Sequence, residues 1–296
     1  MANSHVIAGL HAAGEPPAVR KIAFRDIKEA LAKGVDDFMA MPSHLAFVFL
    51  IYPLFGIGLA ALTFTTNALP LLFPLAAGFA LVGPFAAIGL YEISRRRELG
   101  LEPSWQDAFE VIRSPAMPSI LALGLVLLMI LVCWLFTAQL LYEWIIGPNP
   151  PDSYLRFLDE VMRTSRGWTL ILVGNAVGFV FAAIVLTIGV VSFPMLLDRH
   201  VGPTFAVETS IRAVQENPIQ IGLWGLIVAV ALLLGSLPLF VGLAVVMPVL
   251  GHATWHLYRK AIEPVAISHA PPPLVKVQRY AADFPSSLFQ WRRRNS

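Results

Sequence analysis

Residues 40–47 read AMPSHLAF and residues 116–123 read AMPSILAL, so six of the eight positions are identical. Each stretch opens a long run of apolar residues. A run of about 20 apolar residues can cross a bilayer as a helix. Two such runs entered through nearly the same sequence indicate a chain built from repeated units. The stretch therefore predicts an all-α, polytopic membrane protein with internal repeats.

The composition supports a membrane environment. Apolar residues make up 57% of the 296 positions and charged residues 14%, whereas a soluble domain carries about 25% charged residues. The lone cysteine, Cys133, lies in an apolar run, which excludes an intrachain disulfide and a cysteine metal cluster. The basic residues do not form a face interleaved with aromatic residues, so we expect no nucleic-acid partner. The predicted partner is the lipid bilayer.

Six runs are long and apolar enough to span a bilayer, and strand-like alternation is missing from all of them. They cover residues 43–66, 69–92, 119–146, 168–193, 219–237 and 239–258. Of the 21 Lys and Arg residues, only Arg156, Arg163 and Arg166 fall on one side of this topology. The positive-inside rule then predicts a bacterial inner-membrane protein with both termini in the cytoplasm.

The cytoplasmic segment before each odd-numbered span reads as an amphipathic helix that ends at a proline. The predicted apolar stripes are Ile27, Leu31, Val35 and Phe38; Trp105, Ala108, Phe109 and Ile112; and Val207, Ile211 and Val214. In the first helix, Lys28, Glu29, Asp36 and Asp37 are predicted to lie between the stripe residues. Ser104 and Asp107 form a capping-box pattern at the start of the second. The chain thus reads as three parallel hairpin repeats, at about 20–100, 101–202 and 203–262, in one six-helix domain over 20–262.

Each even-numbered span carries a proline near its cytoplasmic end, where the ring kinks or ends a helix. We expect kinks at Pro84 and Pro248 and a helix end at Pro194. Residues 1–19 do not read as a cleaved signal peptide and are predicted to form a disordered tail. Residues 263–296 are predicted to form a cytoplasmic tail whose basic and aromatic end suits an anionic lipid surface.

His252 and His256 stand four residues apart and share a helix face, a spacing that can hold a metal or contribute to a haem site. The alternative is an aromatic and basic belt at the membrane interface, with Trp255 and Tyr258. Zinc takes three or four ligands, and no Asp or Glu lies within four residues of the pair. We therefore expect no metal and no cofactor, with the two histidines as weak candidates.

Two further groups are candidate sites. Glu92 and His256 each stand eight residues after a proline of an even span, so an acid and a base could face a common cytoplasmic vestibule. Glu92 could instead pair with Arg95 and Arg96. In the sequence GNAVG, Gly174, Asn175 and Gly178 have the spacing that allows close helix packing and a hydrogen bond across the contact.

The stretches AMPSHLAF, GPFAAIGLYEISRRRELG and PSWQDAF together resemble a bacterial family of six-span integral membrane proteins of unknown function, over about residues 20–262. Some members of that family carry a label as a cytochrome c oxidase subunit. The label would imply a haem–copper enzyme, whose catalytic subunit needs about six histidines at membrane depth. At most His252 and His256 could lie there in this chain, so the label does not transfer as catalysis.

The favoured reading of function is a non-catalytic accessory, assembly or scaffold factor, in a membrane protein complex or a homo-oligomer. A small-solute transporter or channel is the alternative, since repeats and proline-broken helices are common in transporters. A membrane enzyme or haem or metal protein that uses His252 and His256 is the third.

Overall fold

The computed structural model describes residues 17–41, 70–104, 106–149, 153–199, 201–237 and 241–263. The chain divides into a unit that ends at Glu263 and a second unit, Pro264–Ser296, that lies outside the described residues. The described part of the first unit is helical, with one isolated antiparallel bridge between Val19 and Ile262. The predicted all-α class is confirmed.

Within the described residues, three helices are long and apolar enough to cross a membrane: α9 (Met117–Ile145), α11 (Ser165–Asp198) and α13 (Pro218–Ser236). They correspond to the predicted spans 119–146, 168–193 and 219–237. With 29 residues, α9 is about 43 Å long, enough for the hydrocarbon core and both interfaces. The predicted span 43–66 lies outside the described residues.

The predicted span 69–92 is not one continuous helix. It divides into α5 (Leu72–Phe79), a 3-10 turn at Ala80–Val82, α6 (Gly83–Ala86) and α7 (Ile88–Glu98). Pro84 stands in the first turn of α6, where its missing N–H costs no hydrogen bond and its ring excludes a continuous helix through this point.

The predicted span 239–258 corresponds to α14 (Leu243–Ala261), which is not among the three candidate spans. Pro248 lies inside this helix. From Leu250 to Tyr258 almost every side chain of α14 is buried within the protein, including His252 and His256.

The sequence predicts a helix end at Pro194, whereas α11 continues through this residue to Asp198. A neighbouring helix, α12 (Pro203–Glu216), supports the continuation. The Ser210 hydroxyl donates to the Thr187 carbonyl at 2.7 Å and accepts from the Val191 N–H at 3.2 Å. Ser210 thus bridges a carbonyl and an N–H group that lie four residues apart in α11, one turn before the proline. We call such an i, i+4 pair of backbone groups a rung.

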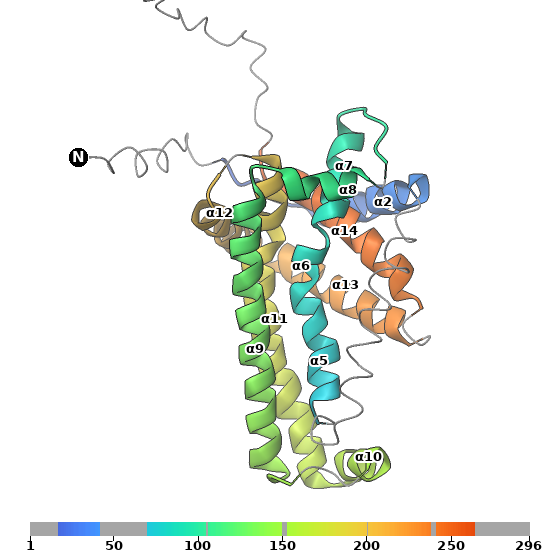
Figure 1. The fold of residues 1–296 in the computed structure, drawn as a ribbon, viewed down its shortest axis with the longest axis vertical. Coiled ribbons are helices and arrows are strands. Elements are labelled where there is room, and N and C mark those ends of the chain that lie inside the picture. The colour runs from blue at the N-terminus through green and yellow to red at the C-terminus, as the bar shows by residue number, and fades with distance from the viewer. Residues whose placement is uncertain are drawn as a thin grey trace, which may run out of the picture. The chain divides into compact units, whose positions relative to one another are not determined.

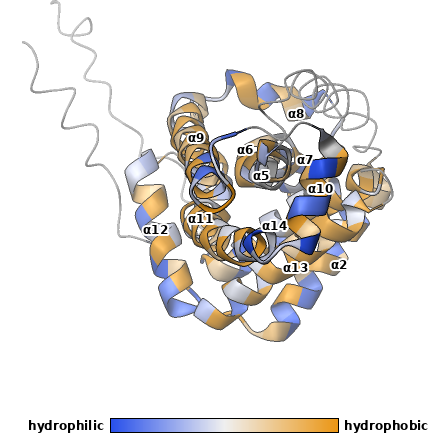
Figure 2. Ribbon diagram, turned by 90° about the horizontal axis from the view of Figure 1, so that it is seen from below, coloured by the Kyte–Doolittle hydropathy of each residue, from blue (hydrophilic) through white to orange (hydrophobic). Residues whose placement is uncertain are grey.

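The remaining helices flank the long ones. α9 and α11 run side by side, with α2 (Phe24–Ala40), α8 (Asp107–Glu110) and α12 at one end and α10 (Tyr154–Arg163) at the other (Figure 1). Hydrophobic residues dominate α9 and α11, while α10 and α12 carry polar residues as well (Figure 2). α2 packs against α14, and α7, α11 and α14 contact one another. The largest fully buried side chains at this end include Tyr91, Phe193, Trp255 and Tyr258.

All three predicted amphipathic helices differ from expectation. α12 buries Ala206, Thr209, Ser210 and Ala213, whereas the predicted stripe of Val207, Ile211 and Val214 is half-buried. Trp105 of the predicted segment 104–118 lies outside the described residues, and residues 106–116 form only α8 and a 3-10 turn, Val111–Arg113. The helix stops here because Ser114 adopts the extended backbone favoured before Pro115. α2 buries Ile27, Ala30, Gly34 and Asp37. The prediction that Asp37 lies on the charged side was therefore wrong, since the contact with α14 is made by the small residues of α2.

Candidate functional site

A buried polar cluster joins α2, α7 and α14 around Asp37, which is 6% exposed. Its Oδ2 accepts hydrogen bonds from the Ser94 hydroxyl at 2.5 Å and from His256 Nε2 at 2.9 Å. Its Oδ1 accepts from the Arg97 guanidinium at 2.5 Å. Ser94 Oγ lies 2.8 Å from His252 Nδ1. Because the single hydroxyl proton of Ser94 goes to Asp37, the hydrogen-bond network assigns a proton to His252 Nδ1.

The electrostatics of this cluster favour an ionised Asp37. Burial raises the pKa of this carboxyl, but hydrogen bonds from His256 and Ser94 and the nearby histidine charges outweigh it, so the pKa lies below its ordinary value. Three hydrogen-bond donors, one of them a guanidinium, offset the cost of burying the Asp37 carboxylate.

Small residues of α2 bring the carboxylate to α14. A Cβ atom built on Gly34 would lie 2.7 Å from both the Ala253 Cβ and the Val249 carbonyl oxygen. Only glycine allows the two helices to approach this closely. Asp37, three residues further along α2, then reaches the histidine face of α14.

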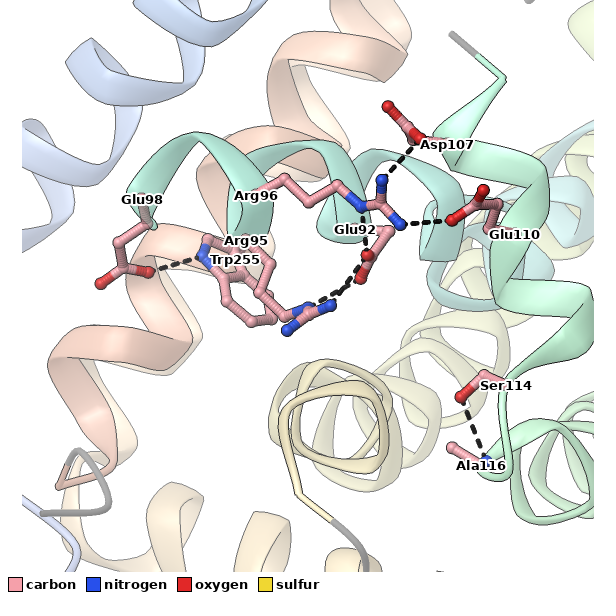
Figure 3. A network of polar contacts seen from close by, with 9 residues as sticks. All are labelled: Glu92, Arg95, Arg96, Glu98, Asp107, Glu110, Ser114, Ala116 and Trp255. Carbon is pink, nitrogen blue, oxygen red and sulfur yellow. Dashed lines mark hydrogen bonds and ion pairs between the residues drawn. The ribbon is translucent and has the colours of Figure 1, made fainter. Parts of the chain in front are cut away.

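A second network lies beside the first, between α7 and α8 (Figure 3). Glu92, 4% exposed, accepts from Arg95 and Arg96 at 2.7–2.8 Å. Arg96 also reaches Asp107 and Glu110, each at 2.5 Å. The Ser104 N–H donates to Asp107, which is the predicted half of a capping box, and this bond and the Arg96 charge lower the pKa of Asp107.

A third group of contacts ties α14 to the ends of α7 and α11. Trp255 Nε1 donates to Glu98 at 3.1 Å, as Figure 3 shows. The Tyr258 hydroxyl donates to Asp198 at 2.7 Å, and Arg259 reaches both Glu98 and Asp198. Polar residues at this end therefore join helices that are far apart in sequence.

The N-terminal segment is held by the later part of the chain. The Asn217 side chain accepts from the Ile22 N–H at 2.8 Å and donates to the Arg20 carbonyl at 3.0 Å. Arg20 N–H donates to the Ala261 carbonyl at 2.7 Å, next to the Val19–Ile262 bridge. Residues 18–22 thus connect the end of α14 to the α12–α13 junction.

The hypothesis of a shared vestibule placed Glu92 and His256 together. In the structure each has its own partners: Glu92 binds the two arginines, which was the alternative, and His256 binds Asp37. His252 and His256 lie on one face of α14, as their spacing predicted, and contact Ser94 and Asp37 respectively. Among the described residues, no group of three or more His, Cys, Asp or Glu side chains is arranged to hold a metal ion.

The GNAVG residues share no common helix contact within the described part. A Cβ on Gly178 would lie 3.1 Å from the Trp134 ring, whereas no described atom comes within 4 Å of one on Gly174. The Asn175 amide donates to the Ile171 carbonyl of its own helix at 2.7 Å.

The comparison with known families bears on the middle of the chain. Residues 72–198 match DUF2189. That family is described as a predicted integral membrane protein, so the expected resemblance to a membrane family of unknown function is confirmed. The match is narrower than residues 20–262 and covers less than half of the chain. No curated protein and no solved structure matches the chain.

The DUF2189 segment holds the whole network of Figure 3 except Trp255. Together with the three long apolar helices, the match identifies an integral membrane protein. Asp37, His252, His256 and Asn217 lie outside the matched segment. DUF2189 supplies no activity that could be assigned to any of them.

Sequence reasoning missed three members of the Asp37 cluster: Asp37 itself, Ser94 and Arg97. One signal was present. Ala30, Gly34 and Asp37 recur at helical spacing, and a face of small residues marks the side on which another helix approaches. Ser94 and Arg97 carry no comparable signal, since a serine and an arginine after an apolar run are ordinary at a membrane surface.

Proposed function

We propose that this protein is a non-catalytic accessory, assembly or scaffold factor of the bacterial inner membrane, with both termini in the cytoplasm. The observation that carries the proposal is that ionisable side chains join separate helices: His252 and His256 of α14 contact Ser94 of α7 and Asp37 of α2, and Arg96, the partner of Glu92 on α7, reaches Asp107 and Glu110. Ionisable groups whose partners lie on neighbouring helices are suited to locking those helices together. They are less suited to exchanging protons or binding a substrate.

Repeated geometry at two joints supports a closed arrangement of three units. Gly34 on α2 and Ser210 on α12 stand at the same distance from Pro42 and Pro218. Gly34 packs on the Val249 carbonyl and the Ala253 nitrogen of α14. Ser210 contacts the Thr187 carbonyl and the Val191 nitrogen of α11. Each helix therefore meets one i, i+4 rung of its neighbour.

The rungs themselves correspond. A glycine lies midway in each, Gly251 in α14 and Gly189 in α11, and both glycines face the first unit, at Leu90 and Pro84. In the first unit we take Gly89 as the counterpart, since it also follows a large aliphatic residue in the return helix.

The third contact between units, between α7 and α8, joins the units in the same order along the chain. A Cβ on Gly89 would lie 3.0 Å from Ala108 of α8. Hence the entry helix of each unit contacts the return helix of the preceding one: α8 on α7, α12 on α11, and α2 on α14. The last pairing returns to the start, which supports a ring of three units with six spans.

A closed ring with a rigid cytoplasmic end favours a scaffold over a moving carrier. Where α2 places Asp37, α12 has Ala213, and where α14 has His252 after its glycine, α11 has Val190. The same joint is thus built once with a charged cluster and once with uncharged residues, among them the hydroxyl of Ser210. This exchange supports a structural use of the charges.

The proposal is tested by native mass spectrometry of the tagged protein, released from its own membranes in mild detergent. A scaffold or accessory factor is expected to carry a membrane-protein partner at fixed stoichiometry. The Asp37→Ala variant, which loosens α2, is expected to lose that partner, and Asp36→Ala is expected to keep it. Recovery of the wild-type protein alone, in monomeric or homo-oligomeric form, would contradict the accessory role.

One observation favours a small-solute transporter as a second candidate. The helix between Leu72 and Glu98 is interrupted around Pro84, and discontinuous helices form binding sites in many transporters. Uptake of solutes into proteoliposomes tests it. Transport that is abolished by Pro84→Ala and retained in Gly174→Ala would favour this candidate over the scaffold.

A further inference from the structure

Helix α10 lies at the opposite end of α9 and α11 from α2 (Figure 1), and hydrogen bonds hold both of its ends. The Ser153 hydroxyl caps its first turn, and Thr164 accepts from the Gly167 N–H at 2.9 Å at the start of α11. A Cβ on Gly167 would lie 2.2 Å from the Val161 carbonyl oxygen, so the turn between α10 and α11 requires glycine. Such a helix has a fixed orientation relative to the spans.

The sides of α10 meet different surroundings. On the inner side the Phe157 ring packs against Tyr142, with ring centroids 6.1 Å apart. Leu155 and Met162 are 76% and 57% exposed, and their spacing places them on one flank. On the next flank, Asp159 and Arg163 form an exposed ion pair. Apolar side chains thus lie between the protein and the charged side.

The apolar flank continues the exposed surface of the spans. An exposed stripe on α9 ends at Trp144, which is 80% exposed. On α11, Trp168 is 53% exposed, and its Nε1 donates to the Met162 carbonyl at 3.1 Å. Exposed tryptophans at the end of a spanning helix mark the interface between hydrocarbon and headgroups.

We infer that α10 is a lipid-binding helix that lies in the headgroup layer of the membrane, with Leu155 and Met162 dipping into the acyl boundary beside Trp168. The occupant of its apolar flank is phospholipid. Continuity with the exposed apolar surface of α11, through the contact between Trp168 and Met162, favours the same surroundings for both. The ion pair of Asp159 and Arg163 lies toward the headgroups and water.

The inference is tested by labelling single cysteines with an environment-sensitive fluorophore in the full-length protein, reconstituted in phosphatidylcholine and phosphatidylglycerol vesicles. Met162→Cys and the adjacent Arg163→Cys are made in a Cys133→Ser background. The native Cys133, exposed in the middle of α9, provides the label at membrane depth. Quenching is measured with nitroxide lipids, shallow and deep, and with aqueous iodide.

We expect the shallow nitroxide lipid to quench the label at position 162 at least about twofold more strongly than the label at 163, with iodide showing the reverse order. The label at Cys133 is expected to respond to the deep nitroxide. Equal iodide quenching at 162 and 163 would overturn the inference, since α10 would lie in water. Protection of position 162 from both quenchers would also overturn it, because a second copy or a partner protein would then cover this flank. Leu155→Cys repeats the test should Met162→Cys fail to fold.

Discussion

Replacing Asp37 by alanine removes the acceptor at the centre of the α2–α7–α14 joint. Ser94, fully buried, and His256, 9% exposed, each lose a hydrogen-bond acceptor. A stranded buried donor costs about 1–3 kcal/mol. The Arg97 side chain is 31% exposed and can be rehydrated, so its lost ion pair adds little. The expected loss in the free energy of unfolding is about 3–4 kcal/mol, near the range for a broken buried ion pair.

Two variants separate this effect from a change of charge. Asp36→Ala removes the same charge from an exposed site on the same helix and is expected to change stability by less than about 0.5 kcal/mol. Asp37→Asn keeps the size and one carbonyl acceptor, so its loss is expected to be about 1–2 kcal/mol.

The assay is equilibrium unfolding by SDS in mixed micelles, followed by tryptophan fluorescence. Trp255, one of the seven tryptophans, is fully buried on α14 next to the joint and contributes to the signal. Hydrogen exchange in α2 provides a second readout, with faster exchange expected in Asp37→Ala. An Asp37→Ala protein as stable as Asp36→Ala would refute the reasoning, because the cluster would then contribute nothing to the joint.

Three further outcomes are expected. The pKa of Asp37 is lowered in the folded state, so its ionised form stabilises the fold. This contribution to the free energy of unfolding is present above the ordinary carboxyl pKa and is lost as pH falls through the lower folded value. SDS unfolding at several pH values should therefore show the difference in stability between wild type and Asp37→Asn narrowing below about pH 4. Gly34→Val drives a side chain into Ala253. It should lower the free energy of opening of α2, measured by hydrogen exchange, by several kcal/mol, whereas the Gly174→Val value should lie within about 1 kcal/mol of wild type. Ser210→Ala removes the bridge on α11 and should lower the free energy of SDS unfolding by about 1–3 kcal/mol, and an unchanged value would show that the rung closes without it.

The sequence predicts the long apolar helices well because a bilayer demands about 20 apolar residues in each span. α9, α11 and α13 follow from that rule alone. The run 69–92 satisfies the same rule, yet it breaks around Pro84, since apolar composition records burial and not helix continuity. At Pro194 the predicted helix end is wrong because of a tertiary contact: Ser210, from the neighbouring helix α12, bridges the backbone of α11 just before the proline.

The candidate site was predictable only in part. The spacing of His252 and His256 predicted a shared face, and the charge spacing on α7 allowed the pairing of Glu92 with Arg95 and Arg96. Asp37 was assigned to the charged side because a carboxylate among lysines reads as solvated. Its burial follows from the close approach at Gly34, a tertiary contact that no local pattern contains.

The most direct test of the closed three-unit account is a disulfide between the two ends of the ring. Val19 and Ile262 pair in an antiparallel bridge, where opposed side chains lie close enough for the bond. With Val19→Cys and Ile262→Cys in a Cys133→Ser background, mild oxidation in native membranes should give an intramolecular cross-link, seen as a reducible mobility shift. The pair Ala18→Cys and Ile262→Cys, one position out of register, should cross-link far less. No preference for the first pair would contradict the closure of α2 on α14.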